Sequence, residues 1–263
     1  MPVEAWTSAD PYEYFMGRWS RLLAHEVVGY LQPEARRRWV DVGCGTGALS
    51  AAVVALAEPQ SLIGVDPSEA YVAEARTRIS DPRADFQLGD ANRLPIADSC
   101  ADEVAAGLVL NFVAEPVDAL AEMRRVLTTG GRATAYVWDY ADGMQMLRRF
   151  WDGAIGEDAS AASLDEAARF PLCREGGLDL CFTDAGIREI TADRIEIHTV
   201  FKGFDDYWNP FLSQQGPAPS YVATLTDDAR DGLRERLRAT LPTRPDGSID
   251  LRARAWICQG IAR

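Results

Sequence analysis

Hydrophobic and polar positions along the chain follow two different periods up to Trp138. From Arg18 to Leu31, apolar side chains recur every three or four residues, as in a helix that packs on a core. Short apolar runs then alternate with helical stretches. The runs lie at 39–42, 62–65, 85–88, 102–110 and 132–138, and the helical stretches at 48–57, 68–79 and 116–127. This alternation predicts an α/β fold, with a mostly parallel sheet, helices on both faces, and a ligand at the carboxyl ends of the strands.

Beyond Trp138 the alternation gives way to helical pieces, and two more strands are predicted at 188–201 and 248–259. We expect a single domain over 1–263. Its predicted parts are an N-terminal helical segment, a cofactor-binding core, two cap or substrate insertions and the last strands. In that order they span 1–38, 39–139, 140–187 with 203–247, and 188–202 with 248–263.

Composition narrows the class of protein. Apolar residues make up 47% and charged residues 25%, as in an ordinary globular chain. The start, MPVEAWTSADPYEYF, lacks the basic and apolar regions of a signal peptide, and no run of about 18 apolar residues exists. We therefore expect a cytoplasmic protein without a membrane partner.

The net charge and the spacing of cysteines and histidines exclude further classes of protein. The formal net charge is −13, with Lys202 as the only lysine, and such a surface repels a nucleic-acid backbone. The five cysteines show no CxxC spacing, and the two histidines are far apart in sequence. We expect free thiols, no metal site and no nucleic-acid partner.

The turn after the first predicted strand, VDVGCGTGAL at 40–49, suits two cofactors. Gly43, Gly45 and Ala48 fit the pattern G-x-G-x-x-G/A, and Asp66 follows Gly43 by 23 residues, where a dinucleotide fold places its ribose-binding acid. S-adenosylmethionine also carries a ribose diol that needs such an acceptor. This motif alone therefore leaves both cofactors open.

Three further features favour S-adenosylmethionine. Asp41 places a negative charge beside the turn, which repels a pyrophosphate and suits a cationic amino group. Gly47 extends the pattern to G-x-G-x-G, which leaves room for a methionyl group. Asp90 ends the third strand, where it can accept from the adenine amine while the Ala91 N–H reaches a ring nitrogen.

With these motifs the chain resembles the class I S-adenosylmethionine-dependent methyltransferases, and is similar to the ubiquinone/menaquinone biosynthesis group of small-molecule methyltransferases. The matching stretches keep the family's order: VDVGCGTG (40–47), IGVDPS (63–68), FQLGDANRLPI (86–96), LVLNFV (108–113) and EMRRVLTTGGR (122–132). The resemblance implies a Rossmann-like, seven-stranded sheet whose last strand is antiparallel. It also implies S-adenosyl-L-methionine as cofactor and S-adenosyl-L-homocysteine as product.

The resemblance implies cofactor contacts at matching positions. The glycine turn would wrap the methionyl end, and the backbone of Leu108 would line it. Arg18 is a candidate partner of the cofactor carboxylate, with a surface salt bridge as the alternative. The full set is Arg18, Asp41, Gly43, Cys44, Gly45, Asp66, Pro67, Asp90, Ala91 and Leu108.

Candidates for a general base are few. Methyl transfer from a sulfonium releases a neutral thioether, so alignment and exclusion of water matter more than an acid. A base matters only where the acceptor is protonated at neutral pH. His198 and Asp139 are weak candidates, because a solvated strand histidine and a helix-capping aspartate explain them more simply.

Aromatic residues indicate the acceptor side. More than half of them lie between Tyr136 and Tyr221, which favours an apolar cap over the cofactor for a small apolar or aromatic acceptor. The alternative is that these rings form the core of the insertion itself. The candidate acceptor-binding residues are Asn111, Phe112, Trp138, Tyr140, Trp151, Phe170, Trp208 and Phe211.

Two other functions stay open on this pattern. A protein that binds S-adenosylmethionine without methyl transfer, or uses it to steer another reaction, would also lack an obvious base. A nicotinamide-dependent oxidoreductase would need space for a pyrophosphate at 43–48 and a proton-transfer residue that the sequence does not show. The sequence does not name the methylated molecule.

Overall fold

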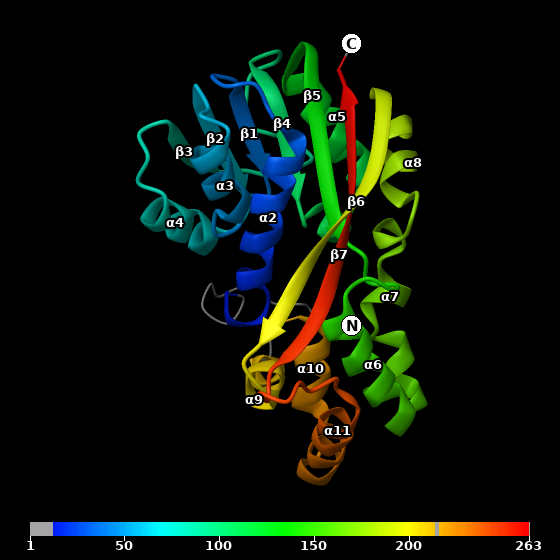
Figure 1. The fold of residues 1–263 in the computed structure, drawn as a ribbon. Helices are drawn as coiled ribbons and strands as arrows, with labels where there is room; N and C mark the ends of the chain where they lie inside the picture. Colours follow the sequence, from blue (N-terminus) through cyan, green and yellow to red (C-terminus); the bar gives the residue numbers. More distant parts are fainter. Residues whose placement is uncertain (1–12, 214–215, 263) are drawn as a thin grey trace. The chain divides into compact units, whose positions relative to one another are not determined.

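The computed structural model describes residues 13–213 and 216–262 (Figure 1). The first twelve residues of the predicted N-terminal segment lie outside this part. The strands are β1 (Arg38–Val42), β2 (Ser61–Asp66), β3 (Ala84–Leu88), β4 (Ala101–Gly107), β5 (Leu127–Trp138), β6 (Arg188–Phe201) and β7 (Ile249–Ile261).

Helices occupy most of the connections between the strands. Those up to β5 are α2 (Arg18–Leu31), α3 (Ala48–Leu56), α4 (Glu69–Arg78) and α5 (Pro116–Val126). Later ones are α6 (Gln145–Glu157), α7 (Glu166–Arg169), α8 (Gly177–Asp184), α9 (Phe204–Trp208), α10 (Pro217–Thr224) and α11 (Asp227–Thr240). Short helical turns are η1 (Glu13–Gly17), η2 (Leu110–Phe112), η3 (Ala159–Ser163), η4 (Pro171–Cys173) and η5 (Asn209–Leu212).

The seven strands form one sheet in the order β3-β2-β1-β4-β5-β7-β6. Strands β1 to β5 pair in parallel. Strand β7 runs against β5, because the Gly130 N–H donates to the Ala262 carbonyl and the Asp139 N–H to the Arg254 carbonyl. Residue numbers thus rise on one strand as they fall on the other. The predicted Rossmann-like sheet with an antiparallel last strand is confirmed.

Contacts divide the chain into two compact units. We call 19–137, 175–195 and 256–263 the sheet unit, and 1–18, 138–174 and 196–255 the helical unit. The predicted insertion 203–247 falls wholly in the helical unit, whereas 140–187 is shared between the two.

Within the sheet unit, strand order creates one position suited to a ligand. The chain runs from β1 outward through β2 to β3, and then returns to place β4 on the other side of β1 (Figure 1). At such a switch point the turns after the two neighbouring strands diverge and leave a crevice at their carboxyl ends. Here those turns are the glycine turn (43–47) and the segment that begins at Leu108.

Two strand boundaries differ from the sequence prediction by three residues or more. Strand β4 ends at Gly107 and not at 110, because Leu108 adopts a left-handed conformation with φ of 60° and η2 follows. Strand β5 begins at Leu127, five residues before the predicted start, and its register against β4 is shifted between Ala101 and Glu103. The segment 128–131, which lies between the predicted helix and strand, therefore belongs to the strand.

Aromatic rings form the core of the helical unit. Phe150 stacks on Phe211 with centroids 4.5 Å apart, and Phe15 and Tyr207 pack against Phe211. The Tyr207 hydroxyl donates to the carbonyl of Met146, which satisfies its buried polar atom. No described helix is long and apolar enough to span a membrane.

Candidate functional site

The glycine turn is shaped by its left-handed residues. Gly43 and Gly45 have φ of 69° and 52°, a region that glycine enters without steric cost. A Cβ on Gly43 would lie 2.4 Å from Val109, so this residue packs directly against the turn after β4. A Cβ on Gly45 would have no atom within 4 Å, so the backbone there faces open space. A ligand can approach the main chain closely at this position.

Asp66 joins the turns after β1 and β2. Its carboxylate accepts from the Gly45 N–H at 2.9 Å and from the Ser68 N–H at 2.8 Å. Burial raises its pKa, and these two backbone donors oppose that rise. A carboxylate offers about four lone-pair positions, so each oxygen keeps capacity for a further donor such as a hydroxyl. Pro67, the next residue, is exposed.

Asp41 is a second carboxylate beside the glycine turn, 1% exposed on β1. It accepts the Ser50 hydroxyl of α3 at 2.6 Å. Burial raises the pKa of Asp41 to about 7, and the neighbouring charge of Asp66 adds to the rise. A cation placed beside this carboxylate would favour its charged form.

Cys44 contributes its backbone to the turn. Its N–H donates to the Val65 carbonyl at 3.1 Å, and its side chain packs in an apolar cluster with Val72, Ala75 and Phe86. Burial raises the pKa of this thiol well above its usual range. The thiol is therefore unreactive at neutral pH.

The turn after β4 combines strain with an unused donor. The left-handed Leu108 is held by its N–H, which donates to the Tyr136 carbonyl at 2.8 Å. A non-glycine residue rarely adopts this conformation, and such strain concentrates at ligand sites. The Asn111 amide nitrogen is buried without a hydrogen-bond partner in the described structure, and Phe112 next to it is 41% exposed.

The turn after β3 completes the edge. Asp90 is exposed and accepts the Asn92 N–H at 2.8 Å, and Ala91 is half-buried. The Gly89 N–H donates to the Asp66 carbonyl at 3.1 Å, which brings this turn to the end of β2. The structure thus gathers at one edge of the sheet unit the residues predicted after strands β1 to β4.

Three residues of this edge escaped sequence reasoning. Ser50 holds Asp41, Val109 fills the space against Gly43, and Tyr136 packs on Gly107, where a Cβ would lie 2.4 Å from its hydroxyl. Ser50 could have been found from the sequence, since it is a polar residue on the buried face of the alanine-rich stretch ALSAAVVAL.

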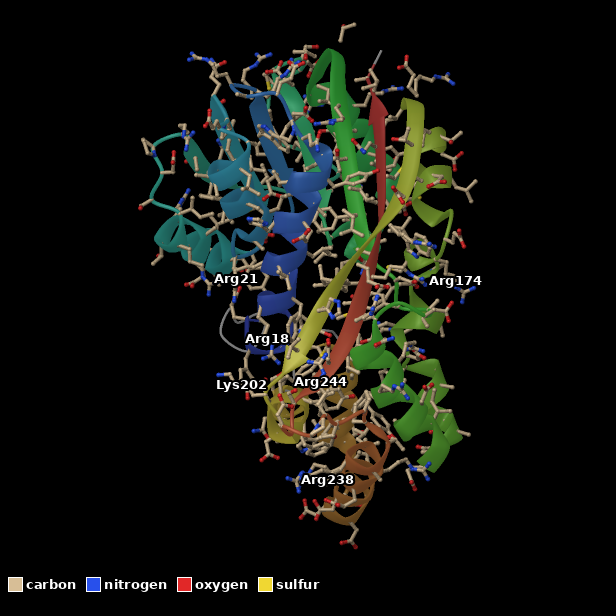
Figure 2. The ribbon with its side chains drawn as sticks, in the orientation of Figure 1. Arg18, Arg21, Arg174, Lys202, Arg238 and Arg244 are labelled. Atoms are coloured by element: carbon tan, nitrogen blue, oxygen red, sulfur yellow. The ribbon has the colours of Figure 1, made fainter. Side chains whose placement is uncertain are left out.

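The polar candidates of the helical unit have structural partners there. Arg18, which is labelled in Figure 2, pairs with Asp206 at 2.9 Å and lies over the Phe201 ring. Asp139 accepts the Ala141 and Asp142 N–H groups at 3.1 Å and pairs with Arg254. The His198 side chain is 60% exposed and pairs with Asp250 at 3.0 Å. The contacts of Arg18 and His198 match the alternatives of a salt bridge and a strand histidine. Asp139 instead accepts from the turn before α6 and does not cap that helix, whose N-cap is Met144.

Most of the aromatic candidates are buried in the helical unit. Trp151 and Phe211 have no exposed surface, and Trp138, Tyr140 and Trp208 are also buried. The Trp151 ring N–H donates to Glu166 inside this core. Tyr140 packs on the half-buried Phe170, with centroids 5.9 Å apart. This burial supports the alternative that these rings form the core of the unit.

Comparison with known proteins gives matches to the sheet-forming segment. A family model described as a methyltransferase domain matches residues 40–135. A 37.1 kDa protein in transposon Tn4556 of Streptomyces fradiae is 41% identical over 150 residues, covering 50% of this chain and 43% of that protein. A demethylmenaquinone methyltransferase of Clavibacter sepedonicus is 38% identical over 101 residues, covering 38% of this chain and 40% of that one. The matched parts make up less than half of either relative.

Solved structures extend the likeness to the whole fold. The phosphoethanolamine N-methyltransferase 2 of Haemonchus contortus, solved with S-adenosylhomocysteine, has a TM-score of 0.59 at 16% identity, and the match covers 96% of this chain and 56% of that one. The strand order, the glycine turn with its two buried carboxylates and the family match agree. Residues 40–135 therefore resemble a methyltransferase domain, and the chain shares the fold of that solved methyltransferase.

Proposed function

We propose that this protein binds S-adenosyl-L-methionine at the glycine turn of the sheet unit and transfers its methyl group to a small organic acceptor. One observation carries the proposal: Gly45 faces open space and donates to the buried Asp66, and Asp41 is buried on β1, two residues before the same glycine turn. The cofactor is a cation with a ribose diol, and this arrangement supplies an acceptor for each feature.

Each turn has a role toward the cofactor under this proposal. Asp41 would face the amino group, and Asp66, with Pro67 beside it, the ribose hydroxyls. The glycine turn and the Leu108 backbone would contact the methionyl chain. Asp90 and the Ala91 N–H would take the adenine. Arg18 stays a candidate for the carboxylate, although its present partner is Asp206.

The cofactor supplies an electrophilic methyl group whose transfer leaves a neutral thioether. The work left to the protein is to align the acceptor and keep water out. Asn111, whose buried amide nitrogen has no partner among the described residues, can donate to a polar atom of the acceptor. The exposed Phe112 ring supports an acceptor with an apolar or aromatic body. The charge of −13 favours a small molecule over a nucleic acid.

The test is turnover with cofactor carrying a labelled methyl group and a panel of small phenols, quinols, amines and carboxylic acids. The proposal predicts S-adenosylhomocysteine formation that depends on one acceptor class and falls in an Asn111→Ala variant. An Asp85→Asn variant serves as control, because Asp85 is an exposed residue on β3 with no role in the proposed site. Tight cofactor binding without transfer to any class would favour a binding protein, or one that steers another reaction.

A further inference from the structure

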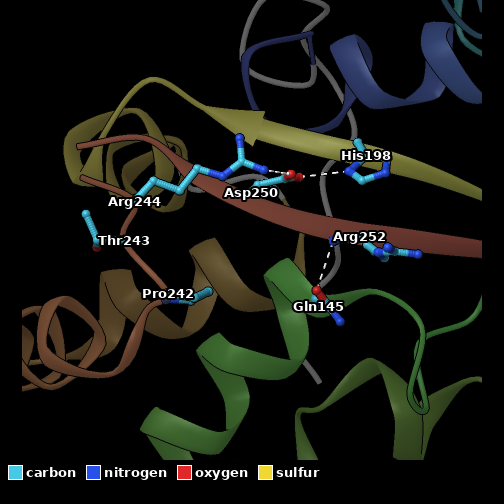
Figure 3. A pocket seen from close by; sticks show the side chains of 7 residues that line it. All are labelled: Gln145, His198, Pro242, Thr243, Arg244, Asp250 and Arg252. Carbon is cyan, nitrogen blue, oxygen red and sulfur yellow. Dashed lines mark hydrogen bonds and ion pairs between the residues drawn. The ribbon is translucent and has the colours of Figure 1, made fainter. Parts of the chain in front are cut away.

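A hollow in the helical unit lies on the outer face of strands β6 and β7. Its volume is about 430 Å³, within the usual range for small-ligand sites. Figure 3 shows that its side chains come from both strands, from the segment before β7 and from the start of α6. They are Gln145, His198, Pro242, Thr243, Arg244, Asp250 and Arg252. We call this set the β6–β7 hollow.

Pairs of charged side chains on neighbouring strands form the strand side of the β6–β7 hollow. His198 on β6 faces Asp250 on β7, with Nδ1 and Oδ1 3.0 Å apart. Arg252, two residues after Asp250 on β7, pairs with Glu196, two residues before His198 on β6. Alternation along β6 places Glu196 and His198 outward, while Ile195, Ile197 and Thr199 point inward and are buried. The charged side chains are thus held in register by the strands beneath them.

Asp250 organises the two basic groups on either side of it. Its Oδ1 pairs with His198 and its Oδ2 with Arg244, so the carboxylate lies between a ring and a guanidinium (Figure 3). The hydrogen bond from His198 lowers the pKa of Asp250, and the charges of Arg244 and Arg252 lower it further. Asp250 therefore stays ionised and holds both basic groups at the hollow.

Hydrogen-bond acceptors in the hollow are mostly occupied, and donors remain. Both Asp250 oxygens have partners, and the Gln145 side-chain oxygen accepts the Arg252 backbone N–H at 2.9 Å. A guanidinium carries five N–H donors, and Arg244 and Arg252 each direct one nitrogen to a carboxylate. The Gln145 amide adds two more donors. A ligand that pairs with these free donors has to carry hydrogen-bond acceptors.

Guanidinium groups supply most of the donors of the hollow. The lining contains two arginines and a histidine against one aspartate, and Glu196 lies beside it as the partner of Arg252. Guanidinium groups recognise phosphate and carboxylate because their planar fork matches two oxygens at once. We propose that the β6–β7 hollow binds the oxyanion group, phosphate or carboxylate, of a small molecule. This site lies within the helical unit and does not depend on the function proposed for the glycine turn.

Calorimetric titration of the purified full-length protein with inorganic phosphate and with malonate, at constant ionic strength set by chloride, tests the proposal. We expect one of the two anions to bind. Arg244→Gln and Arg252→Gln should each weaken that binding at least about tenfold, since each removes a charged donor. Preference for phosphate identifies a phosphorylated ligand, and preference for malonate a carboxylic acid.

Arg230→Gln is the matched control, because Arg230 pairs with an aspartate on exposed helix α11 of the same unit. It should leave the anion affinity unchanged. Titration with S-adenosylhomocysteine checks that each variant is folded and tests the glycine turn separately. No binding of either anion, or binding that Arg244→Gln and Arg252→Gln leave unchanged, would overturn the proposal.

Discussion

Two buried carboxylates beside the glycine turn have different surroundings. Asp66 receives backbone N–H groups from two turns, whereas Asp41 receives the hydroxyl of Ser50. Asp66 therefore fixes the geometry of the edge and still offers lone pairs to a diol. Asp41 keeps a raised pKa because one hydroxyl compensates only part of its desolvation.

Replacement of Asp66 by alanine should weaken the binding of S-adenosylhomocysteine by roughly 10- to 100-fold, because charge-assisted hydrogen bonds to the ribose are lost. Isothermal titration measures the change, and circular dichroism shows whether the variant is folded. Asp85→Asn, at an exposed position on β3, should bind as the wild type does. A folded Asp66→Ala protein with unchanged affinity would exclude the ribose role.

Asp41 predicts a pH dependence of stability in the cofactor-free protein. Its pKa rises from 3.8 to about 7 on folding, so the folded state retains a proton that the unfolded state has lost. This group's contribution is complete below pH 3.8 and is lost as pH rises through about 7. As pH rises from 3.8 to about 7, urea denaturation should show a smaller loss of unfolding free energy for Asp41→Asn than for the wild type. Parallel pH profiles of the two proteins would contradict the assignment.

At the scale of elements, strands and helices with a clear period were predictable to within a residue or two. Helix α2 is predicted and observed at 18–31, and strand β6 at 188–201. The end of β4 was not predictable, because Leu108 is an apolar residue that gives no sign of a left-handed backbone. Its conformation is held by tertiary contacts, with Tyr136 as the partner of its N–H.

The contact between two turns makes Gly43 sensitive to any side chain. Gly43→Ala should destabilise the protein by about 1–3 kcal/mol, because its Cβ would collide with Val109 at a left-handed φ. Gly29→Ala is the matched control on α2, where a Cβ would have no atom within 4 Å. It should be neutral or stabilising by about 0.5–1 kcal/mol. Urea unfolding measures the stability of both variants. Equal changes in unfolding free energy would contradict the packing of Gly43 against Val109.

The turn after β5 depends on Asp139. Asp139→Ala should cost about 2–4 kcal/mol of unfolding free energy, because two backbone N–H groups and Arg254 lose their acceptor. A double-mutant cycle with Arg254→Gln, followed by urea denaturation, measures the coupling of the pair. Asp139→Ala could instead leave stability intact and abolish methyl transfer. Asp139 would then act on the acceptor, and its contacts with the turn after β5 would not be needed for stability.

At the scale of the whole molecule, the sequence predicted those groupings of residues that follow from the order of the strands. Residues that end parallel strands meet at one edge, so Asp41, Asp66 and Asp90 could be grouped before any coordinates were known. Pairs between distant segments left no such pattern. Arg18 pairs with Asp206, 188 residues away, and Arg254 with Asp139, 115 residues away. Such pairs depend on how the chain returns, which periodicity does not encode.

The central claim is that the glycine turn holds S-adenosylmethionine and not a dinucleotide. Calorimetric titration of the purified protein with S-adenosylhomocysteine, NADH and NADPH tests it most directly. The account predicts micromolar binding of the thioether alone, with Asp85→Asn unaffected and Asp66→Ala weakened. Binding of a nicotinamide cofactor without the thioether would contradict it, and would mean that this turn cradles a pyrophosphate.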